Sequence, residues 1–185
     1  MESIKRWLIL TISIIINLCI GFAYAWSVFQ QPLIDYFGWT ASQTSFAFTI
    51  NLSILPIAMI ISGKFVKKYG PKIVVIVGGI IFGLGLYLSG MVVNIYTIYI
   101  TYGLMAGSGI GLIYSCTVSN TVKWFPDKKG LAGGLTAGGF GAGSLIFAPV
   151  AVKFISEQGV LDAFQSLSII SVSYTHLTLP TTPYV

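Results

Sequence analysis

The basic residues of this chain alternate between its apolar runs, and this pattern most constrains how it can fold. Five long apolar runs are followed by the start of a sixth, and nine of the ten basic residues precede the first run or lie in every second gap after it. Lys153 alone lies on the opposite side. Cytoplasmic loops retain basic residues because such loops resist translocation. The pattern predicts an all-α, polytopic protein of the cell membrane with a cytoplasmic N-terminus.

The composition agrees with a membrane protein. Hydrophobic residues make up 55% of the chain and charged residues 8%, against about 25% charged in soluble domains. The basic residues flank apolar runs, so we expect membrane lipid headgroups, and no nucleic acid, as their partners. Cys19 and Cys116 lie inside apolar runs, where we expect packing and no metal site. The acidic residues lie at termini, in loops or at span ends, so we expect neither an enzyme nor a cofactor.

The apolar runs define the predicted spans, because a helix needs about 20 residues to cross the hydrocarbon. These spans are residues 7–29, 40–62, two crossings within 73–122, and 130–152, and residues 160–170 begin a sixth. We expect residues 30–32, Gln-Gln-Pro, to end the first span. Residues 73–122 would extend roughly 75 Å as one helix, so the chain must turn back, and the polar Asn94 is the expected turn.

The last residues differ in kind from the rest. Residues 172–181 match, in order, the translation of a common transposon-based sequencing adapter. We therefore divide the chain into a helix bundle at residues 1–170 and an adapter-derived tail at residues 171–185 that interrupts the gene within the sixth helix. The only histidine, His176, falls in this tail and carries no functional weight.

Glycines four residues apart recur in three spans. Such spacing lets helix backbones approach closely in lipid, where hydrophobic association is weak. It predicts a compact bundle, whose helices either rock or are packed statically. The pairs are Gly79 with Gly83, Gly103 with Gly107, Gly134 with Gly138, and Gly139 with Gly143.

The segment between the second and third spans resembles the loop signature of the major facilitator superfamily. It matches through Gly63, Lys68, Gly70 and Lys72, while Lys67 occupies the usual aspartate position. In the family that carboxylate helps a charge network hold the outward-open state. The resemblance therefore implies that these five residues form a conformational loop whose charge lock is weakened.

A second junction, at residues 120–141, resembles that between the fourth and fifth helices of the oxalate/formate antiporter family, which is related to the monocarboxylate transporters. Residues 24–29, followed by Pro32, resemble the first helix of that family. At the junction we expect Trp124 and Phe125 to act as interfacial anchors. Pro126 should end the fourth span, and Asp127 should cap the fifth.

The resemblance implies the N-terminal six-helix half of a major facilitator fold. It implies secondary active transport of a small organic anion, such as oxalate, formate or pyruvate, by alternating access. Tyr24 and Tyr114 occupy positions that line the cavity in this family, although either could be a packing or interfacial tyrosine. Ala23 replaces a glutamine of oxalate-transporting relatives, which favours a monocarboxylate. Asn17 and Asn51 are expected to form hydrogen bonds between helices.

No basic residue lies in the middle of a span, although an anion needs a compensating charge in a medium of low dielectric constant. The resemblance implies that these cations come from the missing C-terminal half of the same protein. We therefore expect the present chain alone to be inactive. The alternative is a substrate sensor or scaffold of the same fold that does not transport, and its second half would lack such cations.

Overall fold

A computed structural model describes residues 2–178, which contain helices and no strand. The elements are α1 (Glu2–Ile20), η1 (Gly21–Ala25), α2 (Trp26–Phe37), α3 (Ala41–Tyr69), α4 (Pro71–Ser89), α5 (Ile95–Ile98), η2 (Tyr99–Ala106), α6 (Gly107–Trp124), α7 (Lys129–Gln158) and α8 (Val160–Thr178). Five helical stretches are long and apolar enough to cross a membrane, and residues 160–173 form a shorter apolar helix. The prediction of five spans and the start of a sixth is confirmed.

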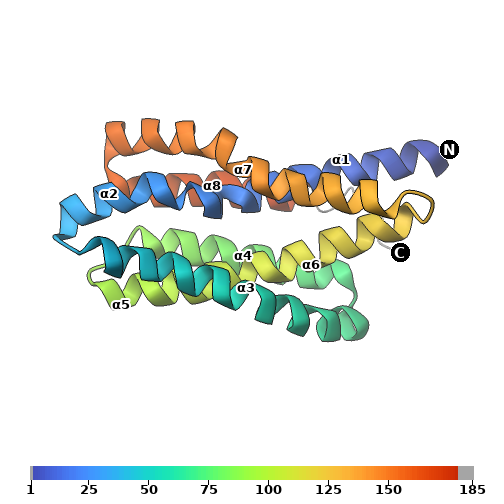
Figure 1. Cartoon of the computed structure of the whole chain (residues 1–185), viewed down its shortest axis with the longest axis horizontal. Coiled ribbons are helices and arrows are strands. Elements are labelled where there is room, and N and C mark those ends of the chain that lie inside the picture. The colour runs from blue at the N-terminus through green and yellow to red at the C-terminus, as the bar shows by residue number, and fades with distance from the viewer. Residues whose placement is uncertain (1, 179–185) are drawn as a thin grey trace.

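The connections between spans alternate between the two ends of the bundle (Figure 1). The N-terminus, the α3–α4 turn and the α6–α7 connection lie at one end, and the other three connections lie at the opposite end. The shared end, which we call the basic end, carries Lys5, Arg6, Lys64, Lys67, Lys68, Lys72, Lys123, Lys128 and Lys129. The segregation of charge inferred from the sequence is therefore present in three dimensions.

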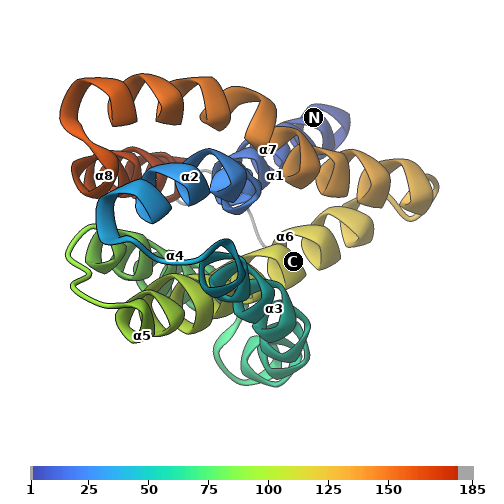
Figure 2. The same cartoon turned by 60° about the vertical axis from the view of Figure 1, so that its left-hand side comes forward.

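Three spans extend further than predicted, and one of them is the fifth, which continues to Gln158. Pro32 does not end the first span, because helix α2 continues to Phe37 and stops where Gly38 adopts a φ of 69°. Membrane helices tolerate an internal proline, and a left-handed glycine is a common helix end. Likewise α3 continues through residues 63–69 and stops at Gly70, with a φ of 81°. The segment predicted as a loop is thus mostly helix (Figure 2).

The fourth span begins as predicted but contains an irregular stretch. The Asn94 side chain accepts a hydrogen bond from the Thr97 amide at 3.0 Å, and the Thr97 hydroxyl accepts one from the Asn94 amide at 3.3 Å. This capping box confirms the turn at Asn94. The next helical residues, Tyr99–Ala106, have π-helical geometry. The hydrophobic pattern gave no sign of that stretch.

The glycine pairs differ in how closely they pack. A Cβ added at Gly107 would lie 2.8 Å from the Asn51 carbonyl oxygen of α3, and one at Gly143 would lie 2.5 Å from the Leu18 carbonyl oxygen of α1. At Gly134 and Gly138 an added Cβ would meet nothing within 4 Å among the described residues. The prediction of close approach holds at the first two positions and fails at the last pair, which lies on an open face of α7.

The α6–α7 connection does not have the predicted roles for Phe125 and Asp127. Phe125 is buried beside Leu10, and its ring centroid lies 4.6 Å from the Arg6 guanidinium. Asp127 forms an ion pair with Arg6, and the N-cap position of α7 is Lys128, which makes no side-chain cap hydrogen bond. Phe125 is therefore not an interfacial anchor, and Asp127 is not a cap. Both instead fasten the start of α1 to this connection.

Helix α8 runs without a break across the predicted boundary at residue 170. Val172 packs against Gly83 of α4. The side chain of His176 and all of residues 179–185 lie outside the described part of the chain. Because the boundary concerns the origin of the sequence and not its conformation, the division into residues 1–170 and 171–185 stays a prediction.

Candidate functional site

Tyr24 and Tyr114, the two predicted substrate contacts, both lie beside Phe140. The ring centroid of Phe140 is 5.0 Å from that of Tyr24 and 5.2 Å from that of Tyr114. The three rings come from η1, α6 and α7, and we call them the open aromatic group. Tyr24 is 39% exposed, whereas Phe140 is 7% exposed. The structure thus brings the two tyrosines together from distant parts of the sequence.

The hydroxyls of these two tyrosines form no hydrogen bond within the described part of the bundle. Among the described residues, neither the Tyr24 nor the Tyr114 hydroxyl forms a hydrogen bond with protein, whereas the Tyr99 hydroxyl donates to the Gln43 carbonyl oxygen at 3.1 Å. A phenol hydroxyl can donate to a carboxylate oxygen. The open aromatic group therefore offers two free donors beside an apolar ring surface.

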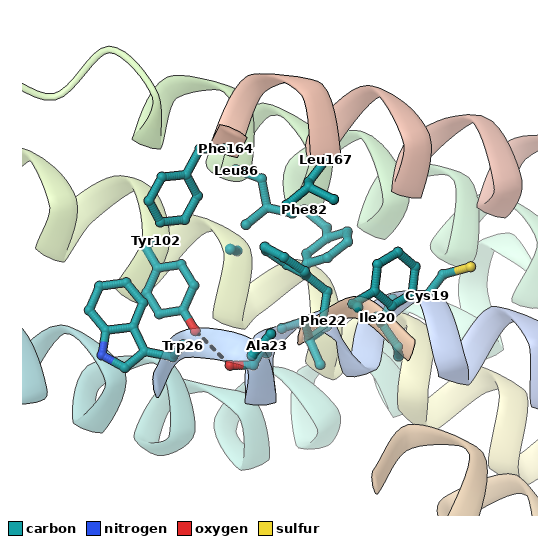
Figure 3. Packing of buried hydrophobic residues seen from close by; sticks show 14 of the residues in the cluster. Cys19, Ile20, Phe22, Ala23, Trp26, Phe82, Leu86, Tyr102, Phe164 and Leu167 are labelled. Carbon is teal, nitrogen blue, oxygen red and sulfur yellow. Dashed lines mark hydrogen bonds between the residues drawn. The ribbon is translucent and has the colours of Figure 1, made fainter. Parts of the chain in front are cut away.

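A second group of three aromatic residues, Trp26, Tyr102 and Phe164, is buried in the core (Figure 3). The Trp26 and Tyr102 rings stack with centroids 4.2 Å apart, and Phe164 lies 6.4 Å from Tyr102. We call these residues the closed aromatic group. The Tyr102 hydroxyl donates to the Ala23 carbonyl oxygen at 2.9 Å. Trp26 is thus a packing residue, as predicted, although its indole N–H has no acceptor among the described residues.

Ala23 belongs to this closed region and not to the open one. It is 2% exposed, and its carbonyl oxygen is occupied by Tyr102. The preference for a monocarboxylate that was inferred from Ala23 therefore gains no support from the geometry.

Two of the asparagines inside spans, Asn17 and Asn51, join helices. Asn17 donates to the Thr117 hydroxyl at 2.8 Å, and Asn51 donates to the Tyr102 carbonyl oxygen at 2.8 Å. Both interactions confirm the predicted hydrogen bonds between helices. They tie the first span to the fourth, and the second to the fourth, around the two aromatic groups.

Sequence reasoning missed a polar stripe on α3. Ser45, Thr49 and Ser53 recur every four residues, and Gln30 donates to the Ser45 hydroxyl at 2.8 Å. Phe48, on the same helix, lies 6.5 Å from the Tyr24 ring. Exposed polar groups fit poorly against lipid, so this stripe is suited to face water or protein. The spacing of four within an apolar helix could have revealed it.

The five residues of the predicted conformational loop lie around the end of α3. Gly63, Lys67 and Lys68 are in the last turns of that helix, Gly70 is the connector, and Lys72 is in the first turn of α4. The Lys68 ammonium lies 5.0 Å from the Tyr69 ring centroid. Within the described residues, the ion pairs involve only other basic residues, Arg6 and Lys153. Among the described residues, no carboxylate forms an ion pair with the lysines of this segment.

Within the part of the chain that the structure describes, no group of three or more His, Cys, Asp or Glu side chains could hold a metal ion. The polar chemistry of the open aromatic group is therefore that of hydroxyls and the nearby polar stripe.

Comparison with known proteins places this arrangement in a family. The chain is 34% identical to the oxalate:formate antiporter of Oxalobacter formigenes over 90% of its own length, and 33% identical to the uncharacterized MFS-type transporter YhjX of Escherichia coli over 86%. It covers 40% of the length of each. It is 31% identical to monocarboxylate transporter 9 of Rattus norvegicus over 83% of its length, covering 30% of that protein. Residues 8–181 match the Major Facilitator Superfamily, and the chain belongs to that family.

Proposed function

We propose that the complete protein is a secondary active transporter of a small organic anion, such as oxalate, formate or pyruvate, and that Tyr24 and Tyr114 contact the substrate. The observation that carries the proposal is the convergence of two tyrosine rings on Phe140, with hydroxyls that have no hydrogen-bond partner among the described residues. The names of the similar proteins, an oxalate:formate antiporter and a monocarboxylate transporter, support a carboxylate as the substrate class.

Transport would require charge that the described residues do not supply in mid-span. The basic residues lie at the ends of the helices, and an anion in a medium of low dielectric constant needs a nearby positive charge. We infer that this charge comes from the remaining length of the protein, which the relatives possess and this chain does not cover. Substrate would then bind between the two halves, whose rocking alternates access, and the present chain alone would be inactive.

The proposed location is the cell membrane, with the basic end in the cytoplasm. Labelling of single cysteines in intact cells tests this orientation. A membrane-impermeant thiol reagent should modify Tyr36→Cys and spare Lys64→Cys, and the reverse result would contradict it. We also propose that residues 171–185 are adapter-derived, which sequencing of the source locus would test.

Flux measurements on the complete protein test the function. Reconstituted in liposomes, it should exchange labelled formate, oxalate or pyruvate. Hydrogen bonds to charged groups contribute about 1.5–3 kcal/mol, so Tyr24→Phe and Tyr114→Phe should each raise KM roughly tenfold or more. Tyr36→Phe, at an exposed helix end, is the control. Normal KM in both site variants would contradict the site. Binding without flux would instead favour a sensor, and neither binding nor flux by folded protein would contradict the anion assignment.

A further inference from the structure

A cavity of about 230 Å³ lies at the basic end, between the last turns of α3 and α6. Its polar lining consists of Lys67 from α3 and of Ser115, Ser119, Asn120 and Lys123 from α6. None of these residues belongs to the open aromatic group. The cavity is therefore distinct from the proposed transport site, and a ligand could bind in it whether or not the complete protein transports an anion.

The cavity carries two positive charges and no negative one. Lys67 and Lys123 both line it, and no acidic residue does. The ion pairs among the described residues are Arg6 with Asp127 and Lys153 with Glu157, and neither is part of the cavity wall. Two ammonium groups that share a small space repel each other. A bound anion would remove this repulsion.

Asn120 gives a second and independent indication of a ligand. It is 4% exposed, and neither its amide nitrogen nor its amide oxygen has a hydrogen-bond partner among the described residues. The amide nitrogens of Asn17 and Asn51, by contrast, both donate to neighbouring helices. Buried polar groups without partners are rare and call for an explanation such as an absent ion. Asn120 is one of the residues that line the cavity with the two lysines, so its amide is placed close enough to donate to an anion there.

We propose that this cavity binds a phosphate group, with Lys67 and Lys123 as its counter-charges and the Asn120 amide as a hydrogen-bond donor. A phosphate has several acceptor oxygens, which suits two ammonium groups, one amide and the hydroxyls of Ser115 and Ser119. Both lysines are in the last turns of their helices, at the level where headgroups of anionic lipids attract basic residues.

The neighbouring surface is suited to a lipid as the source of the phosphate. The same two turns of α3 contribute Phe65 and Tyr69 to a largely apolar groove of about 400 Å³, completed by residues of α4 such as Ile73 and Val77. Acyl chains could lie there while the headgroup occupies the basic cavity. Soluble phosphate would use the cavity alone, so the two sources differ in their need for the groove.

A simpler role for the lysines makes a different prediction. Lysines in the last turn of a helix interact favourably with the negative end of the helix dipole without any ligand. In that case the neutral Asn120 would not affect anion binding. Replacing any other pair of lysines at the basic end would also weaken anion binding as much as replacing Lys67 and Lys123.

Binding to the purified chain tests the proposal. Native mass spectrometry would count retained phosphatidylglycerol against phosphatidylcholine, and thermal unfolding in detergent would be followed with inorganic phosphate against chloride at equal ionic strength. The variants are Lys67→Gln/Lys123→Gln and Asn120→Leu. The control, Lys64→Gln/Lys129→Gln, removes the same charge from the same end without touching the cavity wall.

The expected result is preferential retention of phosphatidylglycerol by the unmodified chain and the control, and a loss of roughly tenfold or more in both cavity variants. Stabilisation by inorganic phosphate without retained lipid, lost in the same variants, would support the site and identify soluble phosphate as the source. Equal losses in the control, normal binding in Asn120→Leu, or no preference for either phosphate source would overturn the proposal. Circular dichroism confirms that each variant is folded.

Discussion

The open and closed aromatic groups share the first and fourth spans but differ in the partners of their polar atoms. Tyr24 and Trp26 are two residues apart, and Tyr102 and Tyr114 both belong to the fourth span. In the closed group the Tyr102 hydroxyl is paired with a backbone carbonyl, whereas in the open group both hydroxyls are free among the described residues. Residue type and position in a span therefore do not separate packing from binding. The two groups differ instead in whether the tyrosine hydroxyl has a hydrogen-bond partner among the described residues.

Helix α7 likewise has a side that packs against other helices and a side that is uncovered among the described residues. Gly143 lies against the backbone of the first span, while Gly138 faces open space, and Phe140 lies between them and contacts both tyrosines of the open group. One side of α7 is thus completed by this chain and the other is not.

Truncating one ring in each aromatic group should give the largest difference in the free energy of unfolding. Trp26→Ala removes a ring that is 3% exposed and should destabilise the bundle by about 3–5 kcal/mol. Tyr24→Ala removes a ring that is 39% exposed and should cost about 1 kcal/mol or less. Denaturant unfolding of the chain in mild detergent measures both. Equal losses would show that the open group is as much a part of the core as the closed one.

Methyl groups added to α7 should give the next largest difference. Gly143→Ala would place a Cβ 2.5 Å from the Leu18 carbonyl oxygen, and this overpacking should cost about 1–3 kcal/mol. Gly138→Ala meets nothing within 4 Å and should be neutral, or stabilising by up to about 1 kcal/mol through helix propensity. The same unfolding assay compares the pair. A loss at Gly138 equal to that at Gly143 would show that the open face of α7 is covered within this chain.

The sequence predicted the topology well because charge segregation depends only on which gaps hold lysines. It predicted span ends less well, since polar residues near the membrane surface can remain helical. Helices α2 and α3 end where Gly38 and Gly70 adopt positive φ, not where polarity begins. Asn94 was recognised correctly because its cap depends on local chemistry alone.

The orientation of residues within the site was the hardest feature to predict. Tyr24 and Ala23 are neighbours, yet one is exposed and the other is 2% exposed within a 3₁₀ turn. That turn coincides with the close approach of Gly21 to the α7 backbone at Gly143, a contact between residues more than a hundred positions apart. A regular helical period cannot show such a local change, so the burial of Ala23 and the contact with Phe140 needed the structure.

Removing one tyrosine hydroxyl from each aromatic group should give a smaller difference in the free energy of unfolding. Tyr102→Phe breaks the bond to the Ala23 carbonyl and should cost about 1 kcal/mol. Tyr114→Phe removes a hydroxyl without a partner in the described residues and should leave stability unchanged. Unfolding of the two variants in parallel gives the comparison, with Tyr36→Phe as the exposed control. A destabilised Tyr114→Phe would mean that its hydroxyl has a partner within this chain and is not free for a ligand.

The smallest expected effect comes from pH and lies outside both aromatic groups. A hydrogen bond from its own backbone amide, together with the hydrogen bond and positive charge of Arg6, lowers the pKa of Asp127 below its ordinary value of 3.8. A carboxyl whose pKa is depressed by folding stabilises the folded state fully above its unfolded pKa, and this contribution is lost as pH falls through the folded pKa.

Asp127→Asn should therefore reduce the decline of Tm below about pH 4, and salt should weaken the difference because the pair is exposed. Thermal unfolding between pH 6 and pH 3, compared between the two proteins, measures this. An identical acid response would show that the Arg6–Asp127 pair adds nothing to stability, and that the basic end depends on the buried Phe125 ring alone.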